Sequence, residues 1–432
     1  MELRLTQLNS LQLFQVLRYG SIFLTSIFVS NLLGNKLLVG QYETMLLYGN
    51  SFFFFWLSGI TANLFPIRSS LHGKDREILF YNAFILISVL SFLFSGLVVG
   101  FSWIDTTVTD KPLFALYAAY IFINAPTYLV EFVFLLEKRY TGVIIYGVLI
   151  FSAQVLVSTL PLLFGYSLYE TVMGLMILSI AKYLFLLKVL RQYSTASVDL
   201  KLLKQILMIS APLVFSLLLS GSIEYINGFI IKGNFSMEAF ADYRIGAREF
   251  PLFLIMCNSM SNVMSGRLAE TQRDGDLQKG LAELKEKTNK LMHLLFPLGI
   301  IFILFSKNIF HFLYPAFDRS YIIFNFYVLL LISRLVFPQT ILLGLRQNKS
   351  IAWASVIEIL VNIILANILL KFMSIQGVAT AMVVAFIAEK IFLISACKRK
   401  GINYLELIPG KTYLLYSTIL LIVFFLSTFS LI

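Results

Sequence analysis

The sequence has little charge. Only 13% of its 432 residues are Asp, Glu, Lys or Arg, whereas 59% are hydrophobic. A soluble domain carries roughly twice that share of charged residues. Apolar runs near twenty residues long match a hydrocarbon layer about 30 Å thick, and the alternating pattern of barrel strands is missing. We therefore predict an all-α polytopic membrane protein.

Cysteine and histidine are also scarce, with two and three residues. Cys257 and Cys397 lie inside or at the end of apolar runs, so they indicate neither a disulfide framework nor a metal site. The histidines have no paired spacing with acids or a nucleophile, which argues against an enzyme. We expect no catalytic residues, no metal and no cofactor.

The formal net charge of +11 suggests nucleic acid at first sight, but most basic residues lie in short loops between apolar runs. Loops rich in Lys and Arg face the cytoplasm in membrane proteins. Basic loops alternate with loops that carry few basic residues, and this pattern predicts a cytoplasmic amino terminus. We expect no nucleic-acid partner.

Hydropathy predicts thirteen membrane helices. They cover residues 11–33, 42–65, 79–103, 113–136, 143–164, 168–190, 205–231, 238–265, 288–305, 321–345, 351–370, 374–396 and 413–432. We group them into an N-terminal six-helix lobe (1–190), a cytoplasmic linker (191–204), a C-terminal six-helix lobe (205–396) and an additional helix (397–432). The connector 266–290 contains Leu277, Leu281 and Leu284 among charges, which suggests a solvated link or an amphipathic surface helix.

A repeat relates the two halves. Gly34-Asn35 followed by Tyr42 matches Gly233-Asn234 followed by Tyr243, and an aromatic run follows each. Because each half holds an even number of spans, both enter the membrane from the same side and are parallel. Two parallel lobes around a central cavity are typical of transporters.

Arginines inside apolar runs are the first candidate site residues, because intramembrane charges usually face a cavity or a partner. Arg244 and Arg248 are four residues apart, so one helix would place them on the same face. Glu224 lies at a similar depth on the preceding span. Paired guanidiniums bind phosphate oxygens well; the alternative is structural pairing with an acid, namely Glu224, Asp242 or Glu249.

Further charges lie within predicted spans. Arg334 is a third candidate for anion binding. Arg18 and Lys182 either bind an anion as well or extend to the headgroups. Glu224, Glu358 and Asn362 are candidates for coupling to H⁺ or Na⁺, with ion pairing as the alternative for the acids. Glu131 and the pair Glu389-Lys390 are predicted to be interfacial.

Four passages together resemble polysaccharide flippases of the Wzx type, within the multidrug/oligosaccharidyl-lipid/polysaccharide exporter superfamily. They are Leu32-Leu33-Gly34-Asn35 with Gly40-Gln41-Tyr42-Glu43, residues 233–253, residues 310–326, and Leu342 to Lys349 followed by Val361-Asn362 and Gly377-Val378-Ala379-Thr380-Ala381. The thirteenth span departs from this pattern, because a twelve-span flippase lacks it and a fourteen-span lipid II flippase exceeds it.

The resemblance implies that the protein flips a polyprenyl-pyrophosphate-linked oligosaccharide from the cytoplasmic to the periplasmic leaflet of a bacterial inner membrane. This transport would proceed by alternating access and would be coupled to an ion gradient. It would serve cell-surface polysaccharide biosynthesis, such as that of O-antigen and lipopolysaccharide. Membrane lipids and a polysaccharide polymerase or other assembly proteins are the implied partners. A lipid II flippase is one alternative. The other is a cation-coupled multidrug antiporter, whose cavity would favour acids over arginines.

Overall fold

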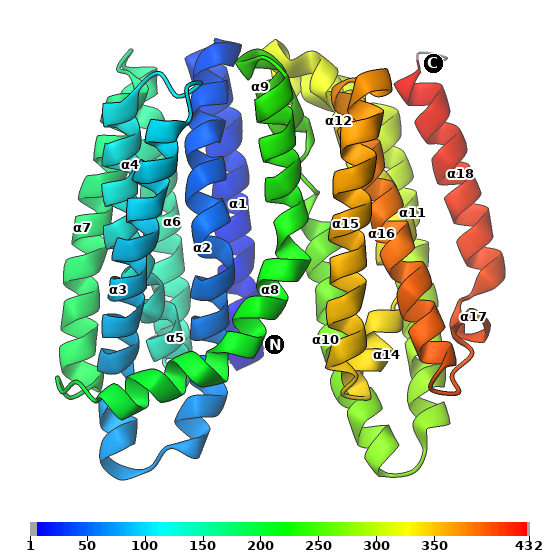
Figure 1. Ribbon diagram of the computed structural model, residues 1–432, viewed down its shortest axis with the longest axis horizontal. Coiled ribbons are helices and arrows are strands. Elements are labelled where there is room, and N and C mark those ends of the chain that lie inside the picture. The colour runs from blue at the N-terminus through cyan, green and yellow to red at the C-terminus, as the bar shows by residue number, and fades with distance from the viewer. Residues whose placement is uncertain (1–6, 430–432) are drawn as a thin grey trace. The chain divides into compact units, whose positions relative to one another are not determined.

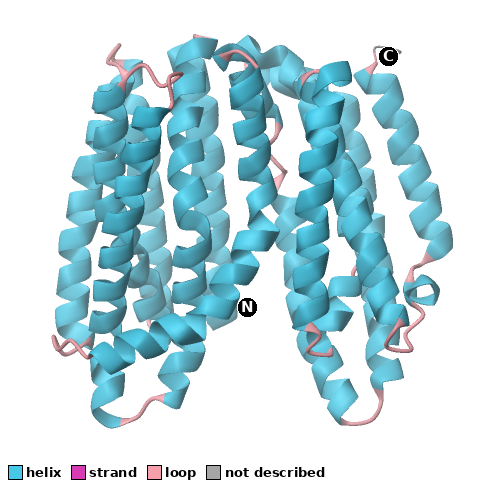
Figure 2. Cartoon of the chain, viewed as in Figure 1, coloured by secondary structure: helices cyan, strands magenta, loops and turns pink. Residues whose placement is uncertain are grey.

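The computed structural model describes residues 7–429, and every regular element in that range is a helix (Figures 1 and 2). The first elements are α1 (Gln7–Leu33), α2 (Lys36–Ser70), α3 (Gly73–Ile104), α4 (Lys111–Asn124), the 3-10 helix η1 (Ala125–Tyr128), α5 (Leu129–Leu136), α6 (Tyr140–Leu163), α7 (Leu168–Tyr193) and α8 (Leu200–Asn234). The remaining ones are α9 (Met237–Gly246), α10 (Pro251–Arg273), α11 (Leu277–Leu313), the 3-10 helix η2 (Pro315–Ser320), α12 (Tyr321–Leu329), α13 (Leu331–Arg334), α14 (Pro338–Gly344), α15 (Asn348–Met373), α16 (Ile375–Lys398), α17 (Tyr404–Leu407) and α18 (Gly410–Thr428).

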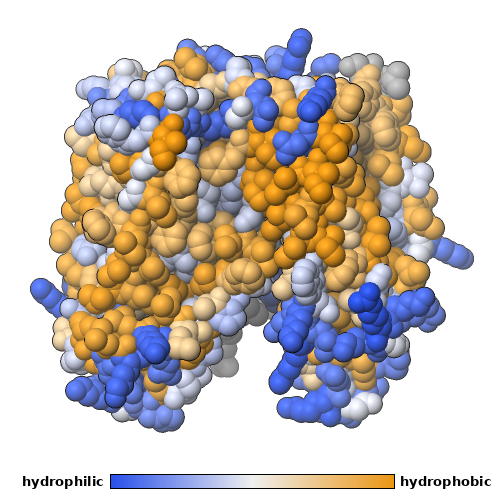
Figure 3. Space-filling model, in the orientation of Figure 1, coloured by the Kyte–Doolittle hydropathy of each residue, from blue (hydrophilic) through white to orange (hydrophobic). Residues whose placement is uncertain are grey.

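Within the described residues, twelve helices are long and apolar enough to cross a membrane. Hydrophilic side chains gather at the helix ends in Figure 3, and apolar side chains cover the segments between them. The predicted all-α polytopic membrane fold is therefore confirmed.

Contacts divide the chain into an N-terminal unit, Met1–Gly221, and a C-terminal unit, Ser222–Ile432. The predicted linker 191–204 is helical at both ends, because α7 extends to Tyr193 and α8 begins at Leu200.

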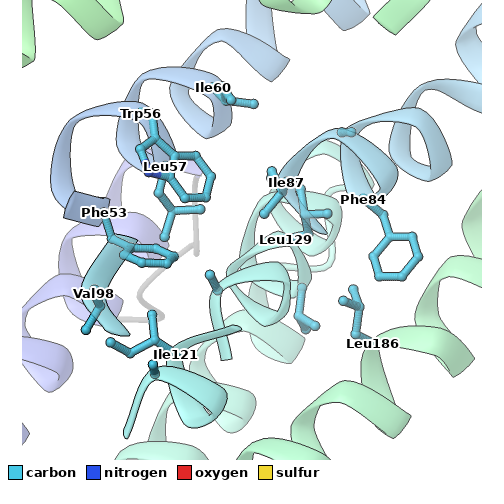
Figure 4. Packing of buried hydrophobic residues seen from close by; sticks show 14 of the residues in the cluster. Phe53, Trp56, Leu57, Ile60, Phe84, Ile87, Val98, Ile121, Leu129 and Leu186 are labelled. Carbon is cyan, nitrogen blue, oxygen red and sulfur yellow. The ribbon is translucent and has the colours of Figure 1, made fainter. Parts of the chain in front are cut away.

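Aromatic residues of α2 form part of the core of the N-terminal unit (Figure 4). Phe53, Trp56 and Ile60 follow one another at helical spacing, so they lie on one face of the helix, and all three are buried. The Trp56 ring stacks on Phe94 of α3 with the ring centroids 5.5 Å apart. This part of the aromatic run is packing surface between helices.

The predicted eighth span, 238–265, is not one helix. It is interrupted between Gly246, where α9 ends, and Pro251, where α10 begins. Proline disfavours helical backbone at the residue before it, and Phe250 is extended, with φ −66° and ψ 119°. The prediction that Arg244 and Arg248 share a helical face is wrong, because Arg248 lies in the break. Neither α9 nor α10 is among the twelve candidate spans, which accounts for the difference from thirteen.

The predicted tenth span, 321–345, is interrupted as well. Helix α13 ends at Arg334, and α14 begins at Pro338. Proline fits the first turn of a helix because the amide hydrogen it lacks has no acceptor there. Both breaks therefore occur immediately before a proline and close to a candidate arginine.

The connector 266–290 is helical on both sides of a turn and amphipathic, as predicted, with Lys279, Lys285 and Glu286 exposed. Helices α10 and α11 extend into it and are joined by a turn at 274–276. Leu281 and Leu284 are buried, and a Cβ added at Gly280 would lie 2.4 Å from Oγ1 of Thr271. Leu281 and Leu284 therefore pack within a close helical hairpin of α10 and α11.

The thirteenth predicted span corresponds to α18, and its last residues, 430–432, lie outside the described range. Helix α18 packs on α11 and α12. The Phe424 ring lies 4.9 Å from that of Phe326 between centroids, and Asn325 donates to Thr428 across 3.1 Å. The additional helix is therefore an integrated part of the C-terminal unit.

Candidate functional site

Arg248, Glu249 and Arg334 line one cavity of about 10 Å³ in the C-terminal unit. Nη2 of Arg334 donates to Oε1 of Glu249 at 2.5 Å, and the two side chains are only 19% and 15% exposed. The guanidinium carbon of Arg334 lies 5.3 Å from the ring centre of Phe386. The cavity is about the size that one water molecule needs. Two arginines predicted separately from sequence thus meet where two helices are interrupted.

Arg244 lies in the last turn of α9, where a cation complements the negative end of the helix dipole. Its Nη1 donates to Oε1 of Glu224 on α8 at 3.2 Å. The Arg244 side chain is 10% exposed and that of Glu224 is 52% exposed. The prediction that this acid and this base lie at one depth is confirmed, and the contact is the ion pair given above as the alternative to anion binding.

A second charged cluster lies in the N-terminal unit, around a cavity of about 70 Å³ lined by Arg18, Glu131 and Lys182. Arg18 forms an ion pair with Glu131, and Nζ of Lys182 donates to Oδ1 of Asn124 at 2.6 Å. The guanidinium of Arg18 also lies over Tyr128, 5.1 Å from the ring centre. With two cations and one carboxylate, the cluster carries a formal charge of +1.

Glu131 was predicted to be interfacial, but it is only 4% exposed and lies inside the unit. Its carboxylate holds the Arg18 guanidinium there. The Nε of Arg18 is a buried donor with no acceptor among the described residues. A buried donor of this kind indicates capacity for a further ligand.

The candidates for ion coupling lie on α8 and α15. Nδ2 of Asn362 donates to Oδ1 of Asn227 at 2.7 Å, and the reverse contact is 3.4 Å. Glu358 lies one turn before Asn362 and is 3% exposed. Its carboxylate has no hydrogen bond or ion pair with any described residue. Glu224 lies one turn before Asn227 on α8, so the amide pair joins the two helices that carry the candidate acids.

Two amides in these clusters, Asn124 and Asn227, were not predicted as site residues. Both lie within apolar runs, where a buried amide needs a hydrogen-bond partner. Asn362, an amide within a span, was a candidate, and the same criterion applies to Asn124 and Asn227. Glu249 was considered as a partner of Arg244 or Arg248, and its pairing with Arg334 was not foreseen.

Between residues 7 and 429, no three His, Cys, Asp or Glu side chains come together as a metal ion would require. Cys257 and Cys397 are both buried thiols.

Comparison with known proteins identifies a family and a shared fold. Residues 51–316, more than half of the chain, match the family described as polysaccharide biosynthesis protein. The chain therefore belongs to this family. None of the curated proteins matches it.

Solved structures share the fold. Lipid II flippase MurJ, in an inward closed conformation, has a TM-score of 0.71 and 16% identity, with 96% of this chain and 92% of that one covered. A eukaryotic MATE transporter has a TM-score of 0.64 and 14% identity, over 95% and 97% of the chains. A MOP superfamily transporter from Pyrococcus furiosus has a TM-score of 0.59 and 13% identity, over 90% and 93%. These structures show that the chain shares the fold of this group of transporters, and the family match places it among polysaccharide biosynthesis proteins, in agreement with the predicted resemblance.

Proposed function

We propose that the protein flips a polyprenyl-pyrophosphate-linked oligosaccharide from the cytoplasmic to the periplasmic leaflet of a bacterial inner membrane, for cell-surface polysaccharide synthesis such as that of O-antigen. Membership of the polysaccharide biosynthesis family and a fold shared with flippases and transporters support transport over catalysis. The observation that carries the proposal is that Arg248 and Arg334 line one cavity. Because it has room for about one water molecule, this cavity must widen during alternating access to admit the pyrophosphate.

Phosphate recognition follows from the chemistry of these side chains. A guanidinium donates two parallel hydrogen bonds to phosphate oxygens, and such bonds strengthen where water is scarce. Interrupted helices in membrane proteins usually border a site, because irregular backbone is tolerated only inside protein or beside a cavity. We assign Arg244, Arg248 and Arg334 to the pyrophosphate, and we assign Arg18 and Lys182 to the same anion at another stage of transport.

Coupling to H⁺ or Na⁺ is assigned to Glu224, Glu358 and Asn362. A buried carboxyl without an ion pair, such as Glu358, is unfavourable as a bare charge and favours a proton or a cation beside it. We also propose a cytoplasmic amino terminus, and a polysaccharide polymerase or other assembly proteins as partners.

The test is flipping of a fluorescent undecaprenyl-pyrophosphate oligosaccharide in proteoliposomes. We expect Arg248→Ala/Arg334→Ala to abolish most flipping at equal incorporation of folded protein, with folding checked by thermal unfolding because Arg334 is also the partner of Glu249. The matched control is Arg319→Ala/Lys371→Ala, which removes the same charge from exposed positions and should leave flipping nearly intact. Equal loss in both variants, or none in the first, would reject the assigned site.

The same vesicles separate the alternatives. Flipping of lipid II but not of the other glycolipid would indicate a lipid II flippase. Export of a cationic dye against a proton or sodium gradient, without glycolipid flipping, would indicate a multidrug antiporter.

A further inference from the structure

A pocket of about 470 Å³ lies between the turn joining α5 to α6 and the last turns of α7. Lys138 and Arg139 come from the turn and Lys188 from α7, so three cations share the pocket. The turn is tight: the amide of Arg139 bonds to the carbonyl of Phe134 at 2.7 Å, and Lys138 has a φ of +57°. The chain accepts an unfavourable backbone conformation at a residue whose side chain lines the pocket.

The positive charge of this pocket is not neutralised. Of the residues that the structure describes, no acid forms an ion pair with Lys138, Arg139 or Lys188. Glu137, next in the chain, pairs with Arg68 instead.

A neighbouring pocket of about 600 Å³ carries less net positive charge. It shares Gln192 and Tyr193 with the first pocket, and its arginines are Arg68, Arg76 and Arg191. It also contains two carboxylates, those of Glu77 and Glu137. The first pocket therefore has the larger excess of positive charge.

The other wall of the first pocket is apolar, formed by Phe134, Phe185 and Val189. Phe185 stacks on Tyr146 with centroids 5.6 Å apart. Beyond the pocket, large apolar side chains project from α6 and α7. They are Ile145, Leu149 and Leu184, which are 55%, 64% and 62% exposed. Leu184 is one turn from Lys188 on the same face of α7. A cationic pocket thus continues into an exposed apolar surface.

We propose that this pocket binds the phosphate headgroup of an anionic membrane phospholipid, with the acyl chains along α6 and α7. Basic pockets at the ends of membrane helices suit such headgroups, and the cytoplasmic leaflet that this end is predicted to face is anionic. A cytoplasmic position of the loop between α5 and α6 accounts for basic residues there. It does not account for three cations that line one pocket beside an apolar surface. A soluble phosphate would leave the apolar surface unused. The inference does not depend on which substrate is transported.

The experiment is native mass spectrometry of the full-length protein titrated with phosphatidylglycerol or phosphatidylcholine. We expect Lys138→Ala/Arg139→Ala/Lys188→Ala to weaken phosphatidylglycerol binding by about tenfold or more and to leave phosphatidylcholine binding unchanged. The control Lys398→Ala/Arg399→Ala/Lys400→Ala removes the same charge from exposed residues at the end of α16 and should have little effect. The single change Lys188→Gln serves if the triple variant does not fold.

Two results would overturn the proposal. An equal loss in the control variant would mean that overall charge attracts the lipid and the pocket does not. Displacement of phosphatidylglycerol by an equal concentration of inorganic phosphate would mean that the site takes a soluble phosphate. Retained binding in Lys138→Arg/Lys188→Arg, together with loss in the alanine variant, would support a headgroup held by charge.

Discussion

Arg334 and Glu249 are 85 residues apart in sequence and are joined by a hydrogen-bonded ion pair of 2.5 Å. Glu249 lies in the break between α9 and α10, and Arg334 ends α13 just before the next break. The pair therefore ties together the two interrupted segments of the C-terminal unit.

Breaking this pair should be costly. We expect Arg334→Ala to lower stability by about 3–5 kcal/mol, because it leaves the Glu249 carboxylate buried without its cation. Thermal unfolding of the detergent-purified protein measures the effect. The double variant Glu249→Gln/Arg334→Gln removes both charges and should recover most of the stability without recovering transport. Recovery of both would show that Arg334 has only a structural role.

We expect Glu358→Gln to abolish the coupling of flipping to an ion gradient without destabilising the fold. Because the Glu358 carboxylate is buried with no ion pair among the described residues, its loss should not lower the melting temperature. Flipping driven by an imposed proton or sodium gradient should fall to the rate without a gradient. Glu406→Gln, outside the candidate spans, is the control. A normal response to both gradients in Glu358→Gln would remove this residue from the coupling site.

Gly246 allows α9 to approach η2. A Cβ at this position would lie 2.4 Å from the carbonyl oxygen of Ser320 and 2.7 Å from Cβ of Ile323. Gly246→Ala should therefore displace α9 and cost about 1–3 kcal/mol, with reduced flipping. Gly233→Ala has open space around the added Cβ and should be neutral or slightly stabilising. Equal stability of the two variants would argue against close packing at Gly246.

Ser374 joins α15 to α16 with φ 55° and ψ −141°, a conformation that favours glycine. Ser374→Gly should raise stability by about 1 kcal/mol, seen as a higher melting temperature. Gly377→Ala in the following turn should do the opposite, because its Cβ would lie 2.4 Å from the Leu369 carbonyl oxygen. A lower melting temperature for Ser374→Gly would contradict this account.

Local signals predicted the spans well, because the length of an apolar run is itself what a membrane helix requires. The break near Ala247 was missed although Phe250-Pro251 carried a local signal against helix. Pairings were harder to predict. Arg18 and Glu131 are 113 residues apart, and which faces of α1 and α5 meet depends on how the whole unit packs. Glu224 and Arg244 were predictable, because one short turn sets their relative depth.

In the structure, Arg18, Arg244 and Arg334 each hold a carboxylate, supplied by Glu131, Glu224 and Glu249. The pyrophosphate of the proposed substrate would therefore compete with a carboxylate tethered to the same chain, whose effective concentration is high. Such competition lowers the affinity of the arginine for the pyrophosphate. It also speeds dissociation of the pyrophosphate, because the tethered carboxylate pairs with the guanidinium again as the pyrophosphate leaves. Under the proposed function, each arginine is thus arranged for exchange of anions and not for permanent capture.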